Sequence, residues 1–288
     1  FTTGTLEGRT FDVTANSANS ITVDPDHTED NTALETDIQT LINDAAATDN
    51  FEIRPHWTLN TLFPDGEGFV KSTDPFDPVG LILSRDTSSD GINISPSGAS
   101  FYFDSSNNSE DGWYDPNALS SGKKNDIILR NGTFFVLRNK SVTALTLNVV
   151  GDVPLTDSAS QVKENVIKQD SFVSIHFPIE LSLIESGLQT SSSFKVTTDP
   201  FAVDGDQLLV YPDVINGFNP SATKSYIYFD SSNNAEDGWY DVNNLSQGKK
   251  GTLKIFKPGK AYIVRKAAEV EENILQLKSM MPYDPFSE

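Results

Sequence analysis

Hydrophobic and polar residues alternate near the start of the chain. Alternate positions within residues 10–24 are hydrophobic on either side of the polar run NSANS: Phe11, Val13, Ile21 and Val23. A period of two places such side chains on one face of an extended strand, and a short run of Asn and Ser is typical of a tight turn. The pattern predicts a β-hairpin.

The period changes in residues 30–46. Four hydrophobic residues follow one another here at helical spacing: Leu34, Ile38, Leu41 and Ile42. The polar run DNT just before them supplies side chains that can cap the first turn of a helix. We expect one short amphipathic helix, with its hydrophobic face packed on the core.

Short β-prone runs fill most of the remaining chain. The first half contains, in order, GLILS, SFYFD, DGWYD, DIILR and TFFVLR, bounded by clusters of Gly, Asn, Asp and Ser. The second half contains DQLLVY, SYIYFD, DGWYD, LKIFK and AYIVRK. Short strands with turn residues at regular intervals are typical of antiparallel sandwiches and barrels. The sequence therefore predicts a mainly β protein with two duplicated antiparallel β-sandwich or barrel-like units and one or two short helices.

The two halves share a nearly identical motif. Residues 103–115 read FDSSNNSEDGWYD and residues 229–241 read FDSSNNAEDGWYD, so that only Ser109 and Ala235 differ. Whatever this motif does, the chain does it twice. Duplication favours a binding or architectural role, in which repetition adds reach or avidity, over catalysis.

A looser correspondence sets the expected domain boundaries. The run FEIRPHWTLNTLF parallels SFVSIHFPIELSLI, and an Asp-Pro-Phe tripeptide follows each run, at residues 74–76 and 199–201. The length of 288 residues also agrees with about two domains. We expect four segments: an N-terminal hairpin and short helix packed on the first unit (1–50), the first β unit (51–155), a linker (156–170) and the second β unit (171–288).

Acidic residues outnumber basic ones, which limits the partners. The chain has 41 Asp and Glu against 21 Lys and Arg, a formal net charge of −20 at pH 7. Phosphate backbones and anionic lipid surfaces repel such a chain, so nucleic acid is a poor partner. The charge suits a saline or calcium-containing exterior, where counterions screen it. Simple solubility is the alternative explanation.

The class of protein is narrowed further by the lack of Cys and by the identity of the first residue. Without Cys the chain has no disulfides, thiolate nucleophiles or zinc-thiolate sites. No hydrophobic stretch approaches the length of a membrane span, and the chain begins with Phe1 rather than Met. We expect an exported protein, extracellular or at the cell surface, with a removed signal peptide.

Each copy of the motif gathers oxygen-bearing side chains in one turn. They are Asp104, Asn107, Glu110, Asp111 and Asp115 in the first copy and Asp230, Asn233, Glu236, Asp237 and Asp241 in the second. A hard cation such as Ca²⁺ prefers crowded carboxylate and amide oxygens, so calcium is a candidate cofactor. The spacing differs from that of an EF-hand, and a hairpin tip is the alternative, since Asn, Asp and Gly suit tight turns.

Other residues of the motif are candidates for contacts with a ligand or a neighbouring subunit. Trp113 and Trp239 offer aromatic faces of the kind that stack on sugar rings, although aromatic residues more often fill small β cores. Paired lysines follow in Gly-flanked turns: Lys123, Lys124, Lys249 and Lys250. These lysines are either solvated or face an acidic surface of a neighbouring subunit.

The sequence offers little support for catalysis. The three His, at positions 27, 56 and 176, form no HxH or HExxH motif. No GxSxG, phosphate-binding loop or dinucleotide fingerprint occurs, and no two acidic residues stand out as a glycosidase pair. We expect no enzymatic activity, with a glycan-acting enzyme as the weakest alternative.

Four runs resemble an uncharacterised family of secreted bacterial proteins: GRTFDVTANSANSITVD, FEIRPHWTLNTLF, DGWYD and PGKAYIVRK. Members of that family combine such a hairpin with Trp-containing repeats that end in a strand carrying Gly, an aromatic residue, Val and Arg. The resemblance covers most of the chain and implies secretion and a β-rich build. It implies no activity or catalytic residues. Members have further β sequence before the first hairpin, which implies that this chain begins inside the pattern.

These features predict a structural subunit of an extracellular assembly, such as a filament or a surface layer, that associates with copies of itself. The expected joint is strand addition at a sheet edge, with residues 1–13 as the first candidate for the added strand. The alternative is a monomeric cell-surface adhesin or glycan-binding module, in which the twin Trp-Tyr-Asp hairpins form two contact sites.

Overall fold

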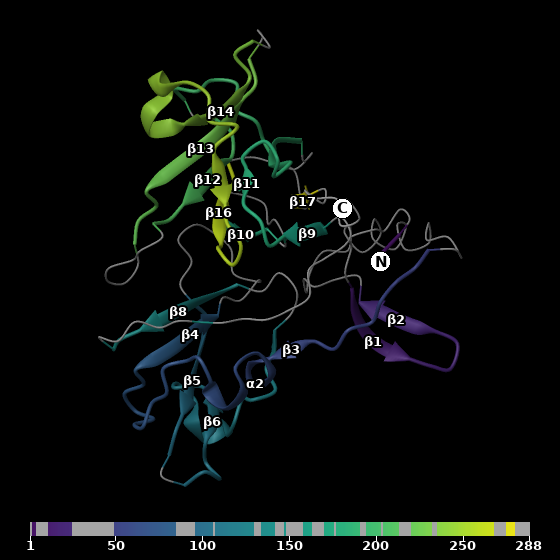
Figure 1. Ribbon diagram of the computed structural model, residues 1–288, viewed down its shortest axis with the longest axis vertical. Helices are drawn as coiled ribbons and strands as arrows, with labels where there is room; N and C mark the ends of the chain where they lie inside the picture. The colour runs from purple at the N-terminus through teal and green to yellow at the C-terminus, as the bar shows by residue number, and fades with distance from the viewer. Residues whose placement is uncertain are drawn as a thin grey trace, which may run out of the picture. The chain divides into compact units, whose positions relative to one another are not determined.

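The computed structural model describes residues 2–3, 11–24, 49–84, 96–105, 107–129, 134–141, 147, 158–162, 170–175, 177–190, 194–202, 204–212, 220–231, 235–267 and 275–279. The predicted helix in residues 30–46 and most of the predicted linker lie outside these residues. Within them the protein is mainly β, with antiparallel sheets, short helices and no closed barrel, which confirms the predicted fold class (Figure 1).

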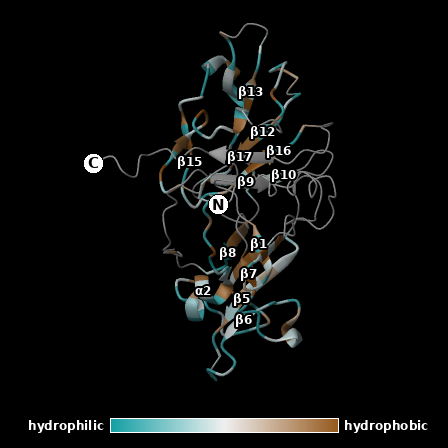
Figure 2. Ribbon diagram, turned by 90° about the vertical axis from the view of Figure 1, so that its right-hand side faces the viewer, coloured by the Kyte–Doolittle hydropathy of each residue, from teal (hydrophilic) through white to brown (hydrophobic). Residues whose placement is uncertain are grey.

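The described residues fall into two compact units. Those between Arg54 and Asp152 form the first unit, and those up to Ile53 together with those from Val153 onward form the second. Figure 2 shows that hydrophobic segments coincide with strands in both units. The four segments expected from the sequence, including the packing of residues 1–50 on the first unit, stay a prediction.

The N-terminal hairpin is present. Its strands β1 (Asp12–Asn16) and β2 (Ile21–Asp24) pair antiparallel with each other, with an irregularity in register between Val13 and Ala15. The polar turn at Ser17 is closed by a hydrogen bond from its backbone N–H to the Ser20 carbonyl oxygen, at 2.8 Å.

The first unit contains a four-stranded antiparallel sheet with the strand order β6-β5-β4-β8. A smaller antiparallel pair is formed by β3 and β7, and the helix α2 follows β3 directly in the chain. The elements are β3 (Trp57–Thr58), α2 (Leu59–Leu62), η1 (Pro64–Gly66), β4 (Gly80–Ser84), β5 (Gly98–Phe103), β6 (Gly112–Tyr114), η2 (Leu119–Ser121), β7 (Ile128–Leu129) and β8 (Phe135–Asn139).

The second unit repeats this plan, with one more strand in its main sheet and one more strand pair. Its main sheet has the order β10-β16-β12-β13-β14, and two pairs accompany it, β11 with β15 and β9 with β17. The elements are β9 (Ser158–Val162), β10 (Asp170–Val173), β11 (Leu181–Ser182), η3 (Leu188–Thr190), β12 (Gln207–Val210), β13 (Lys224–Phe229), β14 (Gly238–Asp241), η4 (Val242–Gln247), β15 (Lys254–Phe256), β16 (Tyr262–Arg265) and β17 (Leu275–Ser279).

The two main sheets correspond strand by strand. The strands β4, β5, β6 and β8 match β12, β13, β14 and β16 in order and in antiparallel pairing. One parallel bridge also recurs, between Ser72 and Phe103 in the first unit and between Thr197 and Phe229 in the second. The duplication seen in the sequence is therefore a duplication of structure, with β10 as the added strand.

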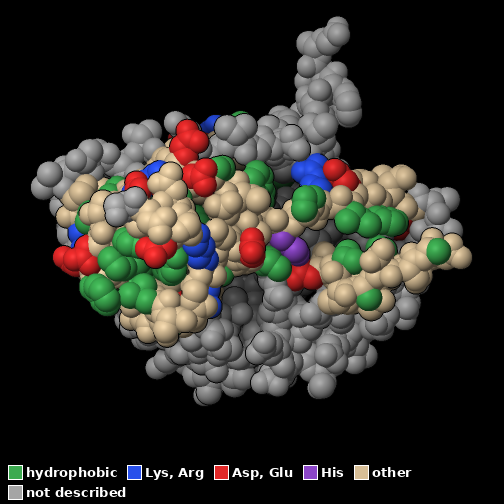
Figure 3. All heavy atoms as spheres, turned by 90° about the horizontal axis from the view of Figure 1, so that it is seen from below, with side chains coloured by type: hydrophobic (Ala, Val, Ile, Leu, Met, Phe, Trp, Pro, Cys, Tyr) green, Lys and Arg blue, Asp and Glu red, His purple; other side chains and the backbone are tan. Residues whose placement is uncertain are grey.

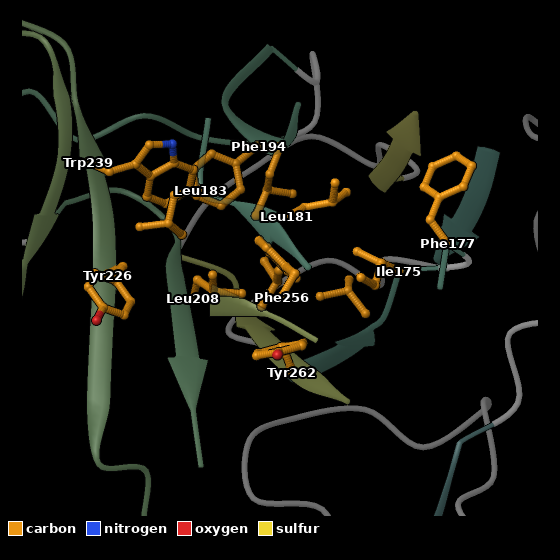
Figure 4. Packing of buried hydrophobic residues seen from close by; sticks show 13 residues of the cluster. Ile175, Phe177, Leu181, Leu183, Phe194, Leu208, Tyr226, Trp239, Phe256 and Tyr262 are labelled. Carbon is orange, nitrogen blue, oxygen red and sulfur yellow. The ribbon is translucent and has the colours of Figure 1, made fainter. Parts of the chain in front are cut away.

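Each unit has its own hydrophobic core around one Trp of the duplicated motif. In the second unit the buried cluster contains Trp239 together with residues from most strands of the sheet (Figure 4). In the first unit a smaller buried cluster contains Trp113, Tyr102, Ile82 and Phe69. Both clusters contain several aromatic residues, each of which buries a large hydrophobic area.

A capping box marks the same position in both units. In the first, the backbone N–H of Thr58 donates to Thr61 Oγ1 at 2.7 Å, and the N–H of Thr61 donates to Thr58 Oγ at 3.2 Å, which fixes the start of α2. In the second, the N–H of Ser182 donates to Glu185 Oε2 at 2.7 Å, and the N–H of Glu185 donates to Ser182 Oγ at 3.3 Å.

The second capping box should make the stability of its unit depend on pH. The hydrogen bonds from the backbone and then from the hydroxyl of Ser182 lower the pKa of Glu185 below its ordinary value of 4.5. A lowered carboxyl pKa contributes stability that is present above the ordinary value and is lost as the pH falls through the folded value. The Glu185→Gln variant should therefore be less stable than the parent at neutral pH, and this difference should shrink below pH 4.5. Urea unfolding of the parent and of the Glu185→Gln variant, at neutral pH and below pH 4.5, measures this difference in stability. A difference that is the same at both pH values would contradict the lowered pKa of Glu185.

Candidate functional site: the twin hairpins

The duplicated motif forms a β-hairpin in each unit. In the first, β5 pairs with β6 from Phe101↔Tyr114 to Phe103↔Gly112. In the second, β13 pairs with β14 from Tyr226↔Asp241 to Phe229↔Gly238. Residues 104–111 and 230–237 therefore connect the two strands of each hairpin, so that two Asp and one Glu lie in each connection.

Both Trp side chains point into the cores and are fully buried, with 0% exposure. The Trp239 ring lies 5.5 Å from Phe194 and 5.7 Å from Tyr228, measured between ring centroids, and the Trp113 ring lies 5.6 Å from Tyr102. This placement favours the packing role over an exposed platform for sugar rings. The copies differ in one respect, because Trp239 Nε1 donates to Gln189 Oε1 at 3.2 Å, whereas no hydrogen-bond partner of Trp113 Nε1 is found in the described chain.

The neighbouring Tyr residues lie on the opposite side of each hairpin. The hydroxyl of Tyr114 donates to the Glu110 carbonyl oxygen and that of Tyr240 to the Glu236 carbonyl oxygen, both at 2.8 Å. Burial first, and then the nearby charges of the Glu and of the following Asp, raise the pKa of both Tyr hydroxyls. Both hydroxyls therefore stay protonated and hold the hairpin tip against its strand.

One acidic residue of each tip hydrogen-bonds to the hairpin itself, and Asp115 caps the turn that follows the first hairpin. Asp111 Oδ1 accepts from the backbone N–H and the hydroxyl of Ser105, at 2.7 and 2.9 Å, and Asp237 Oδ1 accepts equally from Ser231, at 2.7 and 3.0 Å. Asp115 Oδ1 accepts from the N–H of Asn117 at 2.8 Å. Such bonds are typical of Asp in turns.

The other candidate calcium ligands are less clustered. Asn107 Oδ1 accepts from Ser109, and Asp241 Oδ2 accepts from Lys224 Nζ at 2.8 Å. Asn233 lies outside the described residues. The remaining candidate ligands that the structure describes are Asp104, Glu110, Asp230 and Glu236. Within the described chain no three His, Asp or Glu side chains are grouped so as to hold a metal ion. Calcium at the tips stays a prediction.

The first lysine of each pair donates a hydrogen bond to the backbone of the hairpin tip. Lys123 Nζ donates to the Ser109 carbonyl oxygen at 2.8 Å, and Lys249 Nζ donates to the Ala235 carbonyl oxygen at 2.7 Å. Only backbone oxygens are used, which explains why these two positions can differ in side chain. The lysine side chains also pass over Gly112 and Gly238, where an added Cβ would lie 3.0 Å from the lysine Cδ in both copies.

The second lysine of each pair connects the turn to the strand. Its backbone N–H donates to the carbonyl oxygen of the core Trp, from Lys124 to Trp113 and from Lys250 to Trp239, both at 2.7 Å. Lys250 Nζ also donates to the Gln247 carbonyl oxygen at 3.3 Å. The paired lysines therefore act within their own unit, and a contact with a neighbouring subunit stays a prediction.

Sequence reasoning missed one pair of exposed aromatic residues. Phe76 and Phe201 belong to the repeated Asp-Pro-Phe tripeptides, and each is 86% exposed. Asp74 Oδ1 accepts from the N–H of Phe76 at 2.8 Å, and Asp199 Oδ1 accepts from that of Phe201 at 2.9 Å. The repetition of the tripeptide was visible, but its exposure was not. Figure 3 shows that hydrophobic side chains also reach the surface elsewhere, among acidic and basic ones.

Comparisons with known proteins add no assignment: no protein-family model, no curated protein and no solved structure matches the chain. The resemblance to a family of secreted proteins stays an expectation. Among the described residues no helix is long and hydrophobic enough to cross a membrane.

Proposed function

We propose that the protein is a structural subunit of an extracellular assembly, a filament or a surface layer, and that it associates with copies of itself rather than catalysing a reaction. One observation carries this proposal: the chain contains the same β unit twice, and the most similar part of the two units is a hairpin whose polar groups bond to the hairpin itself. These hydrogen bonds hold the hairpin in one conformation. Rigid repeated units suit a building block better than a single reaction centre.

Strand addition between copies is the joint that this architecture supports. Among the described strands both main sheets are open rather than closed into barrels, and an edge of an open sheet is where a further strand can be added. An incoming strand binds such an edge through main-chain hydrogen bonds, which depend little on side chains. The strong negative charge of the chain opposes association at low salt, so we expect assembly to need counterions.

Deleting residues 1–13 should abolish assembly and leave the body folded. The deletion removes the start of β1, the candidate for the added strand, while both hydrophobic cores lie in later residues. Light scattering measures assembly, and circular dichroism with urea unfolding measures the fold. Unchanged assembly of the shortened chain would exclude this segment as the joint.

An adhesin that binds glycans is the second candidate, and the twin exposed Phe side chains favour it. Phe76 and Phe201 present flat hydrophobic faces at equivalent turns. Two equivalent contact sites in one chain would add avidity for a glycan with repeated units. A glycan array probed with the parent and with the Phe76→Ala, Phe201→Ala double variant separates this role from assembly, because the substitutions should abolish glycan binding only if these faces are the contact sites.

A further inference from the structure

The single difference between the two copies of the duplicated motif adds an acceptor tripeptide to the first. Ser109 completes the tripeptide Asn-Asn-Ser at residues 107–109, whereas the second copy reads Asn-Asn-Ala at residues 233–235. The tripeptide Asn-X-Ser or Asn-X-Thr, with X other than Pro, is the acceptor of N-linked glycans, which are attached to the amide nitrogen of the Asn. The first hairpin therefore carries an acceptor tripeptide and the second does not.

The two side chains of this tripeptide contact each other. Asn107 Oδ1 accepts from the hydroxyl of Ser109 at 2.9 Å and from its backbone N–H at 3.3 Å. A backbone N–H can only donate, so the amide group of Asn107 turns its oxygen toward Ser109 and its nitrogen away from it. Among the described residues, none accepts a hydrogen bond from Asn107 Nδ2, the atom to which a glycan is attached.

The acceptor tripeptide lies on an exposed and ordered turn. Residues 107–110 are all exposed, and they form the turn between β5 and β6. Lys123 Nζ holds the backbone of this turn through its hydrogen bond to the Ser109 carbonyl oxygen, at 2.8 Å. Asn107 can therefore be reached in the folded protein without opening a hydrophobic core, as a surface acceptor requires.

The other acceptor tripeptides of the chain are placed differently. They begin at Asn93, Asn131, Asn139 and Asn244, of which the first two lie outside the described residues. Asn139 is half-buried in the strand β8, and Asn244 is half-buried within η4. Among the acceptor tripeptides that the structure describes, the one at Asn107 has the exposed Asn.

We propose that Asn107 is the attachment site of a glycan and that the tip of the second hairpin stays unmodified. In the transfer, Asn107 Nδ2 forms a bond to the anomeric carbon of a sugar that is carried on a diphosphate. The bond between that carbon and the diphosphate oxygen breaks, the diphosphate leaves with the electron pair, and the amide loses one proton. The inference rests on the expected export of the protein, and it is independent of self-association.

A glycan at Asn107 gives the two similar hairpins different surfaces. Glycans are bulky and hydrophilic, so the tip of the first hairpin stays outside any close contact between copies of the chain. The tip of the second hairpin keeps its bare turn, which such a contact can cover.

The duplication supplies a matched control within one digest. The protein is purified from the cells that produce it naturally and is cleaved with a protease that cuts before Asp. This releases residues 104–110, DSSNNSE, and residues 230–236, DSSNNAE, which differ at one position. By mass spectrometry we expect the glycan-bearing share of the first peptide to be at least about tenfold that of the second. A first peptide without glycan, or equal shares in both peptides, would overturn the proposal.

Two substitutions exchange the difference between the copies. Ser109→Ala should abolish the glycan, and Ala235→Ser should add a second one at Asn233. Each new side chain already occurs at that position in the other copy, so the hairpins should keep their fold. Asn107→Gln separates attachment to the amide from attachment to a hydroxyl, because a glycan that persists in this variant would contradict the assignment. Light scattering of the same proteins measures assembly, so failure of this proposal and failure of the proposed function are distinguishable.

Discussion

Replacing Trp239 with Ala is expected to lower the free energy of unfolding of the second unit by about 3 to 5 kcal/mol. The indole is fully buried between Phe194 and Tyr228, so its removal leaves a cavity and costs the hydrogen bond to Gln189. Urea unfolding followed by circular dichroism measures the change without relying on Trp fluorescence.

Trp57 provides the control for this experiment. Its side chain is 49% exposed, so Trp57→Ala should change the free energy of unfolding by less than about 1 kcal/mol. If Trp239→Ala were instead as stable as the parent and lost binding to a glycan, the indole would be a contact site and its assignment to the core would be wrong.

The second large effect concerns the buried ion pair between Lys266 and Asp206. Lys266 is 6% exposed, Asp206 is fully buried, and Lys266 Nζ donates to Asp206 Oδ2 at 2.5 Å. Backbone N–H groups of Lys195 and Ala267 also donate to this carboxylate, both at 2.8 Å. Asp206→Asn leaves a buried ammonium facing a neutral amide, so it should lower the free energy of unfolding by about 3 to 5 kcal/mol.

The pair between Lys140 and Asp77 is the matched control. It joins the same two residue types at 3.2 Å, but the side chains are 39% and 83% exposed. Water screens the exposed pair, so Asp77→Asn should cost less than about 1 kcal/mol. Urea unfolding measures both variants, and equal effects of the two substitutions would contradict the distinction between the buried and the exposed pair.

Many of the strands and the duplication were predictable from the sequence because the signals are local. Alternating residues around NSANS predicted β1 and β2, and the repeated motif predicted the hairpins β5–β6 and β13–β14. Period and turn chemistry act over a few residues, so they can be seen without knowledge of tertiary contacts.

The role of the motif was harder to predict because it depends on partners that the sequence does not mark. Trp113 and Tyr114 are neighbours that face opposite sides of a strand, and the sequence does not say which side is the core. Lys123 donates to a backbone oxygen, an acceptor that every residue carries. The only available signal was the equal spacing from Ser109 to Lys123 and from Ala235 to Lys249.

The difference in exposure between Val136 and Ile263 could not be predicted from the sequence. The strands β8 and β16 read FVLR and YIVR at matching positions, and nothing in these letters indicates that Val136 is exposed and Ile263 buried. In the second unit Ile263 pairs with Phe172 of β10, a strand far earlier in the chain, and such long-range neighbours cannot be recognised from local sequence.

The most direct test of a self-assembling structural role is negative-stain microscopy of the parent protein, combined with light scattering, at rising salt, with calcium and then with a chelator. We expect filaments or sheets once counterions screen the negative charge. Loss of these assemblies on chelation alone would further assign a calcium site to the acidic hairpin tips. A monodisperse monomer under every condition would contradict the structural role and favour the adhesin.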